Sequence, residues 1–185
     1  MRLILASASP RRKELIKKID DLTVEIVPSL ADEHTTATSP VEYATDLAEL
    51  KAKDVFFKRG GVVLGADTVV AVEGKILGKP KDAEQAFEMF RLLCGKTHSV
   101  ITGICIVSDE LTIKDAEISL VTFGEFDYDR VAEYVGTGSP FDKAGGYGIQ
   151  DEQVKAMVTS IEGDFDNIVG LPTKKIENLL KQFRR

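Results

Sequence analysis

The sequence is poor in the residues that form disulfide frameworks and cysteine–histidine metal centres. Its 185 residues include two cysteines, Cys94 and Cys105, two histidines and no tryptophan. The cysteines form no CxxC pair and have no zinc-type spacing to the histidines, so we expect two reduced thiols, buried or partly buried. Of the histidines, His34 has no second ligand pattern, and we expect His98 to hydrogen-bond within the fold. Cysteine usage of this kind favours a cytoplasmic protein.

Long hydrophobic runs and an excess of basic charge are also missing. No stretch is long enough to span a membrane, and the first residues lack a signal-peptide pattern. Lys and Arg number 24 against 30 Asp and Glu, a formal net charge of -6, which argues against non-specific binding to nucleic acid. With 43% hydrophobic residues, the chain can bury a sizeable core. We expect one ordinary domain over residues 1–185, or two small lobes around one cleft.

Glycine is concentrated in one segment, Gly136–Gly148, which holds five of the chain's fifteen glycines. Glycine at this density weakens helix and strand alike, but it lets backbone N–H groups approach a ligand closely. The segment also contains Asp142 and Lys143, so it fits a phosphate-binding loop. A flexible loop without a ligand is the alternative interpretation.

The N-terminal segment predicts a short buried strand followed directly by a helix. Residues Leu3–Ala6 are apolar, Ser9 suits the N-cap, and Pro10 suits the first helical position. Three cations then fall in the first helical turn: Arg11, Arg12 and Lys13. The helix dipole disfavours cations there, so we expect a bound anion such as phosphate to complete the site. A solvated basic turn is the alternative.

A single carboxylate interrupts a segment that is otherwise apolar almost throughout. Residues Val62–Val72 are mostly apolar and β-branched, which predicts a central strand, and Asp67 lies in its middle. A buried Asp is costly unless it is paired or binds a metal. Asp67 could therefore hold a cation or act as a base, or it could be a structural residue bonded to nearby backbone.

A lysine lies within the apolar face of the second predicted helix. The pattern from Ser39 to Glu42 is typical of a capping box with proline at the first helical position, and it predicts a helix to about Lys58. Lys51 projects near the middle of the apolar stripe of that helix. It can extend along the core surface to solvent, but next to an anion site we expect it to point into the cleft.

Helices and long antiparallel-type strands both occur in the remaining chain, without a regular βαβ alternation. This predicts an α/β fold with a mixed central sheet flanked by helices. Beyond a hairpin at 76–77, we expect helices at 82–93, at 127–135 and from 172 onward, and strands at 99–107, 111–123, 154–161 and 168–169.

Eight short motifs occur in a specific order and spacing: Leu5–Arg12, Leu47–Ala52, Gly65–Thr68, Gly78–Asp82, His98 with Thr102–Gly103, Asp142–Gly145, Tyr147–Gln150 and Val169–Pro172. Together they resemble the Maf family of nucleoside triphosphate pyrophosphatases over nearly the whole chain. The resemblance implies two lobes around a cleft, similar to the inosine triphosphate pyrophosphatases. It also implies hydrolysis between the α- and β-phosphates, with a divalent cation, Mg²⁺ or Mn²⁺, as cofactor.

The resemblance also implies a substrate class. The Gly65–Thr68 motif with Gln150 is similar to the branch that hydrolyses dTTP and UTP, whereas the branch acting on 7-methyl-GTP usually has other residues at Thr68 and Gln150. The chain departs from the family at Asp151–Ala156, where a glycine-containing stretch is typical. This departure leaves the base preference open. Removal of modified pyrimidine nucleotides is a further expectation from the family.

Residue roles follow from both the local patterns and the resemblance. We expect the triphosphate to be bound by Arg11, Arg12, Ser7 and Ser9, and the leaving pyrophosphate to be neutralised by Lys51 and Lys79. Asp67 is the candidate for activating water, directly or through the metal. Glu33 is the expected second metal carboxylate, although by itself it resembles a solvated loop acid. We expect Thr68 and Gln150 to contact the base or sugar, and Asp142 and Lys143 to order the glycine-rich segment.

Other functions remain open at this point. The same site could serve a phosphatase or a kinase, although no Walker A pattern is present. A nucleotide-binding regulator of cell division without turnover is the non-enzyme alternative, and hydrolysis of 7-methyl-GTP is the alternative within the family. A homodimer is plausible, but no residue identifies its interface.

Overall fold

Seven strands form one mixed sheet in the computed structural model, which describes residues 1–183. The strand order is β2-β1-β3-β5-β6-β7, and β4 pairs with β3 beside this path. The elements are β1 (Arg2–Leu5), α1 (Pro10–Leu15), β2 (Thr23–Ile26), α2 (Pro40–Arg59), β3 (Val63–Val72), β4 (Lys75–Leu77), α3 (Ala83–Leu93), β5 (Thr97–Val107), β6 (Thr112–Phe123), α4 (Tyr128–Gly136), α5 (Glu152–Lys155), β7 (Val158–Glu162), α6 (Phe165–Val169) and α7 (Thr173–Leu180), with 3₁₀ turns at Ile16–Lys18, Ser139–Asp142, Ala144–Gly146 and Lys181–Phe183.

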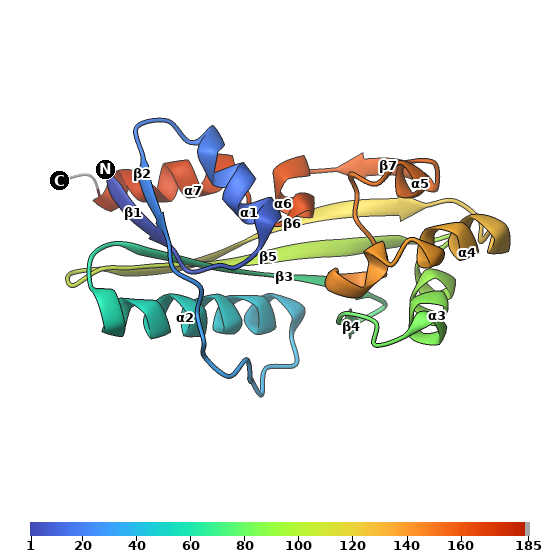
Figure 1. The fold of residues 1–185 in the computed structure, drawn as a ribbon, viewed down its shortest axis with the longest axis horizontal. Helices are drawn as coiled ribbons and strands as arrows, with labels where there is room; N and C mark the ends of the chain where they lie inside the picture. Colours follow the sequence, from blue (N-terminus) through green and yellow to red (C-terminus); the bar gives the residue numbers. More distant parts are fainter. Residues whose placement is uncertain (184–185) are drawn as a thin grey trace.

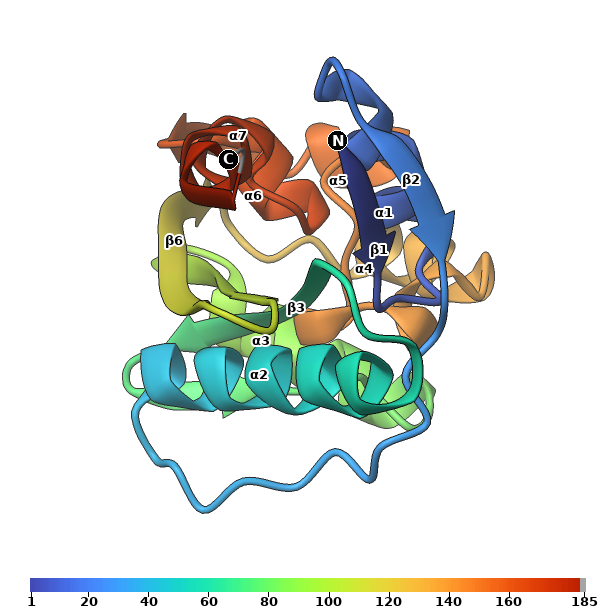
Figure 2. The same cartoon turned by 90° about the vertical axis from the view of Figure 1, so that its left-hand side faces the viewer.

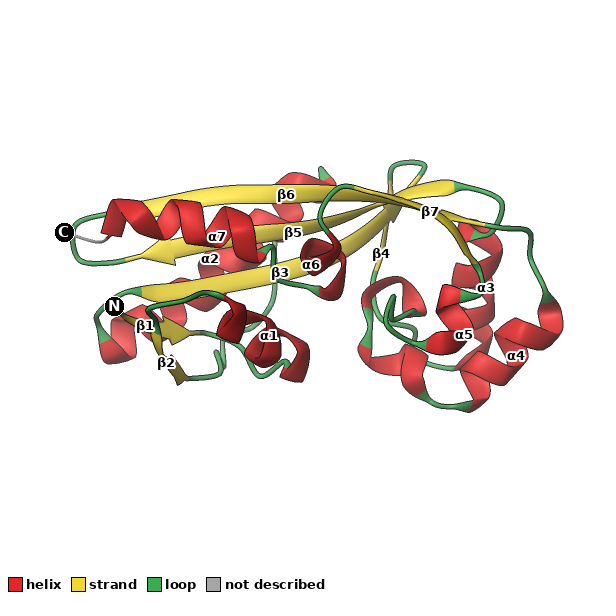
Figure 3. Cartoon of the chain, turned by 90° about the horizontal axis from the view of Figure 1, so that it is seen from above, coloured by secondary structure: helices red, strands yellow, loops and turns green. Residues whose placement is uncertain are grey.

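The three long strands β3, β5 and β6 run along the long axis of an elongated molecule (Figure 1). Helix α2 lies on one side of them, and α6 and α7 lie on the other, as the view along the long axis shows (Figure 2). Helices α3, α4 and α5 gather at the end of the molecule remote from both termini (Figure 3). The expected α/β class, a mixed sheet flanked by helices, is therefore confirmed.

Strand β3 has one edge that is only partly paired. On one side it pairs with β5 along Val63–Ala71. On the other side it pairs with β1 through Val63 and Leu64 and with β4 through Val70–Val72. Within the part of the chain that the structure describes, no strand pairs with Gly65–Val69 on this side. We call these five residues the open edge of β3.

Helix α2 packs unusually close to the sheet because two facing residues are glycine. A Cβ built on Gly65 would lie 2.2 Å from the Ala48 carbonyl oxygen, and one on Gly103 would lie 2.3 Å from the Ala44 carbonyl oxygen. No side chain fits at such distances, so both positions need glycine. The contact fixes how α2 sits over β3 and therefore which α2 side chains reach the open edge.

Aromatic side chains form the core at the end of the sheet near α3 and α4. Phe90 and Phe123 stack with ring centroids 6.1 Å apart, and Tyr134 meets Phe90 edge-on at 5.8 Å. His98 and Tyr147 complete this aromatic cluster around Phe123. All five residues are buried, so this end is held mainly by packing.

Both cysteines are free thiols, as expected: Cys105 is buried and Cys94 is partly buried. Burial raises the pKa of Cys105 to about 12 and that of Cys94 to about 11, so neither is a reactive thiolate at neutral pH. Among residues 1–183, no helix is long and apolar enough to cross a membrane.

Three local predictions are wrong. The strand expected over Val154–Ile161 begins only at Val158, because residues 152–155 form helix α5. The residues expected as a strand at Ile168–Val169 belong to helix α6, where the Asp164 carboxylate caps the helix by accepting from the Asp166 N–H at 2.8 Å. Two apolar residues, Ile168 and Val169, are too few to show whether apolar positions recur with the period of a strand or of a helix.

The third wrong prediction is the capping box at Ser39. Helix α2 does begin at Pro40, but the Ser39 side chain makes no capping bond.

Candidate active site

The turn between β1 and α1 brings Arg12 to the open edge of β3. Ser9 caps the helix, as predicted, by accepting the Arg12 N–H at 3.4 Å, and the Ser9 N–H donates to Ser7 Oγ at 3.2 Å. Arg12 then donates from Nη2 to Thr68 Oγ1 at 3.0 Å and from Nε to the Gly170 carbonyl at 2.9 Å. These bonds fix the guanidinium beside β3.

Lys51 and two carboxylates form an ion-pair cluster on the α2 side of the same edge. Lys51 Nζ lies 2.5 Å from Asp67 Oδ1 and 3.0 Å from Glu33 Oε1. The side chains of Lys51 and Asp67 are 12% and 13% exposed, whereas Glu33 is 54% exposed on its loop. Lys51 therefore turns toward the open edge, and it compensates the charge that Asp67 brings into the strand.

The charged residues on the α2 side of the open edge act electrostatically on Arg12 on the other side. Burial lowers the pKa of the Arg12 guanidinium, and the negative charge of Asp67 opposes this. Arg11 lowers the same pKa, and Glu33 raises it. Arg12 remains charged at neutral pH because a guanidinium does not deprotonate in proteins. The predicted site residues Arg11, Glu33 and Asp67 thus each act electrostatically on Arg12.

Arg11 connects α1 to the glycine-rich segment. Its Nη1 donates to Asp142 Oδ2 at 3.0 Å, and Lys143 Nζ donates to Asp142 Oδ1 at 2.7 Å. Lys143 also donates to the Ser139 carbonyl at 2.6 Å. Although burial raises the pKa of Asp142, the bonds from Lys143 and Arg11 bring it below its ordinary value. Asp142 and Lys143 thus bond to one another, and they link this segment to Arg11 and to the Ser139 carbonyl.

Lys79 and Gln150 lie apart from this cluster. Lys79 is exposed between β4 and α3, and among the described residues it has no ion-pair partner. Its segment joins the glycine-rich segment through a bond from the Gly145 N–H to the Gly78 carbonyl at 2.9 Å. Gln150 is exposed in the turn before α5. The structure thus gathers Arg12, Lys51, Asp67, Glu33 and Thr68. Among residues 1–183, no hydrogen bond or ion pair joins these five residues to Lys79 or Gln150.

The donor set can be tested for a divalent cation. Within residues 1–183, no group of three or more His, Cys, Asp or Glu side chains converges. Glu33 and Asp67 do place carboxylate oxygens around one point, the Lys51 ammonium. Mg²⁺ typically takes one or two carboxylates and completes its shell with water and substrate phosphates. Glu33 and Asp67 match that number of carboxylates, and the Lys51 ammonium already occupies the point between them.

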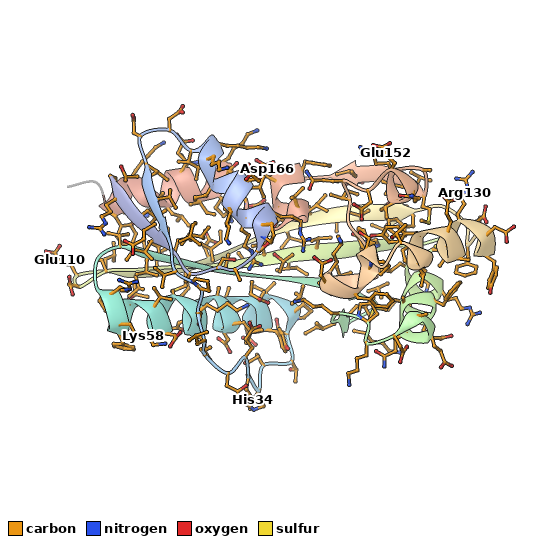
Figure 4. The ribbon with its side chains drawn as sticks, viewed as in Figure 1. His34, Lys58, Glu110, Arg130, Glu152 and Asp166 are labelled. Atoms are coloured by element: carbon orange, nitrogen blue, oxygen red, sulfur yellow. The ribbon has the colours of Figure 1, made fainter. Side chains whose placement is uncertain are left out.

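The two histidines lie outside this cluster. His34 is exposed on the loop before α2, as Figure 4 shows. His98 is buried and its Nε2 lies 2.7 Å from the Tyr147 hydroxyl, so the predicted hydrogen bond within the fold is confirmed. Burial lowers the pKa of His98 to about 4, which keeps the ring neutral.

Two buried residues support the site although the sequence prediction gives them no role. Thr102 on β5 lies beside Thr68, and Asn167 on α6 lies beneath Thr102. Thr102 belongs to the motif Thr102–Gly103 of the family resemblance, and Asn167 lies two residues before the motif Val169–Pro172. Those motifs are the signal that could have identified them.

The fold is shared with solved structures. The Ham1 protein of Staphylococcus aureus superposes with a TM-score of 0.59 at 14% identity over all of both chains. A protein from Mycobacterium abscessus described as a nucleoside-triphosphatase and dITP/XTP pyrophosphatase gives 0.52 at 12% identity over 100% of this chain and 95% of that one. At these identities the likeness shows the fold alone.

The family is shown by sequence. The model of the Maf family, described as Maf-like protein, matches residues 2–183, and the chain belongs to that family. Its relatives include the dTTP/UTP pyrophosphatase of Thermococcus gammatolerans, 45% identical over 96% of this chain and 94% of that protein. The dTTP/UTP pyrophosphatases of Thermosipho africanus and Bacillus cereus are 46% and 44% identical, over 97% and 98% of this chain and 92% and 95% of those proteins.

Proposed function

We propose that this chain hydrolyses dTTP and UTP to the nucleoside monophosphate and pyrophosphate. The observation that carries the proposal is the pairing of Asp67 with Lys51 beside Arg12, at the open edge of β3. A carboxylate, a lysine and an arginine in this arrangement supply a base and the positive charge that phosphate transfer needs. Relatives named dTTP/UTP pyrophosphatase at 42–46% identity support the substrate class.

Phosphate is bound by the turn between β1 and α1 together with the first turn of α1. Arg12 has two of its nitrogens held by protein oxygens, and its Nη1 has no partner among the described residues. Arg11 lies next to it, with Ser7 and Ser9 shaping the turn. As pyrophosphate leaves, its growing negative charge is stabilised by Lys51, and by Lys79 from the segment after β4.

Asp67 activates the attacking water. Its Oδ1 is held by Lys51, and its Oδ2 has no hydrogen-bond partner in the described part of the chain. A carboxylate oxygen in this position can accept a proton from water while the water oxygen attacks the phosphorus of the α-phosphate. The bond from that phosphorus to the bridging oxygen of the β-phosphate breaks, and pyrophosphate departs with the electron pair.

A divalent cation, Mg²⁺ or Mn²⁺, is part of the proposal. Glu33 and Asp67 would hold it, and when bound it would neutralise phosphate oxygens and lower the pKa of water. The base would be recognised by Thr68 and Gln150. We further propose that modified pyrimidine nucleotides are substrates, and that the chain acts in the cytoplasm as one domain with two lobes facing each other across the site.

The test is to follow pyrophosphate release from dTTP, UTP, CTP, 7-methyl-GTP and ITP, each with Mg²⁺, with Mn²⁺ and with a chelator. We expect monophosphate and pyrophosphate from dTTP and UTP, and no turnover with the chelator. Preference for 7-methyl-GTP would retain the chemistry and overturn the assignment of Thr68 and Gln150. Tight binding of every nucleotide without turnover would support a regulator of cell division instead.

A further inference from the structure

We propose that Thr102 is a positioning residue for phosphate binding. Its hydroxyl, anchored on the main-chain carbonyl of Asn167, fixes Thr68 and through it the guanidinium of Arg12. The inference rests on the proposed function, because it takes Arg12 to bind the triphosphate. Thr102 itself is fully buried and touches no substrate.

The sheet register brings the two threonines together. Thr68 on β3 and Thr102 on β5 are directly opposite one another in the antiparallel ladder. Their Oγ1 atoms lie 2.9 Å apart. The neighbouring residues Asp67 and Gly103 face α2, so the two threonines face the opposite side, toward α1 and α6. Thr102 is thus connected to Arg12 through Thr68.

Counting protons gives this chain of hydrogen bonds a direction. Thr102 has one hydroxyl proton, and it donates to the Asn167 carbonyl at 3.1 Å. In the pair with Thr68 its oxygen must therefore accept. Thr68 then donates to Thr102 at 2.9 Å, in preference to the Gly170 carbonyl at 3.4 Å. The Thr68 oxygen keeps its lone pairs for the Arg12 Nη2–H, which arrives at 3.0 Å.

Asn167, the last residue in this series of hydrogen bonds, is held in place by several bonds. Asn167 is fully buried, and its side-chain amide donates to the Val100 carbonyl at 3.0 Å and to Ser119 Oγ at 2.9 Å. The main-chain carbonyl of Asn167 lies in the last turn of α6, where carbonyl groups lose their helical partners. The Thr102 hydroxyl satisfies that carbonyl. The anchor therefore belongs to two strands and a helix at once.

The consequence for Arg12 is a guanidinium held at two points. Thr68 receives Nη2, and the Gly170 carbonyl just after α6 receives Nε. A planar guanidinium fixed in this way presents its remaining nitrogen in one orientation and loses little freedom when a phosphate binds. Without the Thr102 hydroxyl, Thr68 can turn its proton to the Gly170 carbonyl instead. The Thr68 hydroxyl then has no fixed orientation, and its bond with Arg12 Nη2 is weakened.

The experiment compares Thr102→Val, which removes only the hydroxyl, with Thr102→Ser, which retains it. Thr97→Val is a matched control, because Thr97 and Thr122 form a similar cross-strand pair at 2.8 Å on the exposed end of β5 and β6. Binding of inorganic tripolyphosphate is measured by calorimetry, and KM and kcat are measured with dTTP. We expect Thr102→Val to weaken tripolyphosphate binding about tenfold and to raise KM by a similar factor, with Thr102→Ser and Thr97→Val within about twofold of the parent chain.

A purely structural role is separated by repeating the change in an Arg12→Lys background. If Thr102 acts through Arg12, Thr102→Val has little further effect there. Equal losses in both backgrounds, or unchanged tripolyphosphate binding in Thr102→Val, overturn the inference. If Thr102→Val does not fold, Thr102→Cys replaces it, with a smaller loss of the same kind expected.

The two proposals fail in different ways. A parent chain that binds tripolyphosphate but never cleaves dTTP contradicts the proposed function, while the binding comparison still decides the role of Thr102. Turnover of dTTP that is insensitive to Thr102→Val contradicts the role of Thr102 alone. A parent chain that neither binds tripolyphosphate nor cleaves dTTP overturns both.

Discussion

The two ends of the sheet treat buried polar groups in opposite ways. Near the open edge of β3, Arg12, Lys51 and Asp67 are charged and partly accessible. In the aromatic cluster at the other end, His98 and Tyr147 are neutral, fully packed and bonded to one another. Charges at the first end are only partly compensated by protein atoms, so they suit a ligand. The neutral pair at the second end is enclosed by packed side chains, and its hydrogen bond joins the glycine-rich segment to β5.

The largest effect expected is from Asp67→Asn. It preserves shape but removes the proton acceptor and the charge that faces Lys51, so we expect kcat with dTTP to fall about 10³-fold and KM to change little. Steady-state kinetics measures both. Glu88→Gln, which alters an exposed pair with Arg91 on α3, is the control and should retain full activity. Retained turnover in Asp67→Asn would show that the charged end does not carry the chemistry.

The next largest effect is expected at the close contact between α2 and β3. Gly65→Ala forces a methyl group 2.2 Å from the Ala48 carbonyl oxygen, and α2 must shift with Lys51 on it. We expect a loss of about 3 kcal/mol or more in the free energy of unfolding, with a loss of activity. Gly136→Ala is the matched control. Gly136 ends helix α4 with nothing within 4 Å of its added Cβ, so alanine should be neutral or stabilise by up to about 1 kcal/mol.

Equal costs for Gly65→Ala and Gly136→Ala would contradict this account of α2. Urea unfolding of the two variants decides the matter. An active Gly65→Ala enzyme would show that the position of Lys51 is less restricted than the contact implies.

His98 sharpens the comparison through pH. Its pKa of about 4 in the folded chain lies below the ordinary value of 6.5. The folded state therefore binds fewer protons than the unfolded state between these values. The contribution of His98 is complete above pH 6.5 and is lost as the pH falls toward 4, at a cost on the order of 2–3 kcal/mol.

Urea unfolding as a function of pH measures this, with His98→Gln for comparison. The variant should lose less stability than the parent chain between pH 6.5 and 4, while kcat at neutral pH stays close to that of the parent. The same slope in both proteins would mean that His98 is not the group responsible. A large loss of kcat in His98→Gln would assign the neutral end a part in the chemistry.

Local signals were sufficient for the parts of the site that are close in sequence. Ser9 and Pro10 predicted the start of α1, and the helical period placed Lys51 on the face of α2 that meets the sheet. The partner of Lys51 could not be derived in the same way. It depends on how α2 sits over β3, which is set by the two close glycine contacts.

The support behind Arg12 was beyond local reasoning for the same reason. Thr68, Thr102 and Asn167 are far apart in the chain and meet only through sheet register and the docking of α6. Helix α6 itself has five residues, too few for an apolar period, and its start depends on the Asp164 cap. The eight family motifs included Thr102 and Gly170, but a motif does not say which atoms touch.

The smallest effect expected concerns the ion pair that joins the two ends. Arg11 and Asp142 connect α1 to the glycine-rich segment, with side chains 32% and 63% exposed. Exposed pairs typically contribute less than about 1 kcal/mol and are screened by salt. Asp142→Asn should therefore change the free energy of unfolding by less than about 1 kcal/mol at low salt, and by less again at high salt.

The control for Asp142→Asn is Glu25→Gln, which alters an exposed pair with Arg2 on the paired strands β1 and β2. Urea unfolding at both salt concentrations compares the two variants, and similar small losses are expected. A loss of several kcal/mol in Asp142→Asn alone would mean that this pair holds the two ends together. The glycine-rich segment would then be an essential part of the folded core, and the contrast between a charged end for ligands and a neutral end for stability would no longer hold.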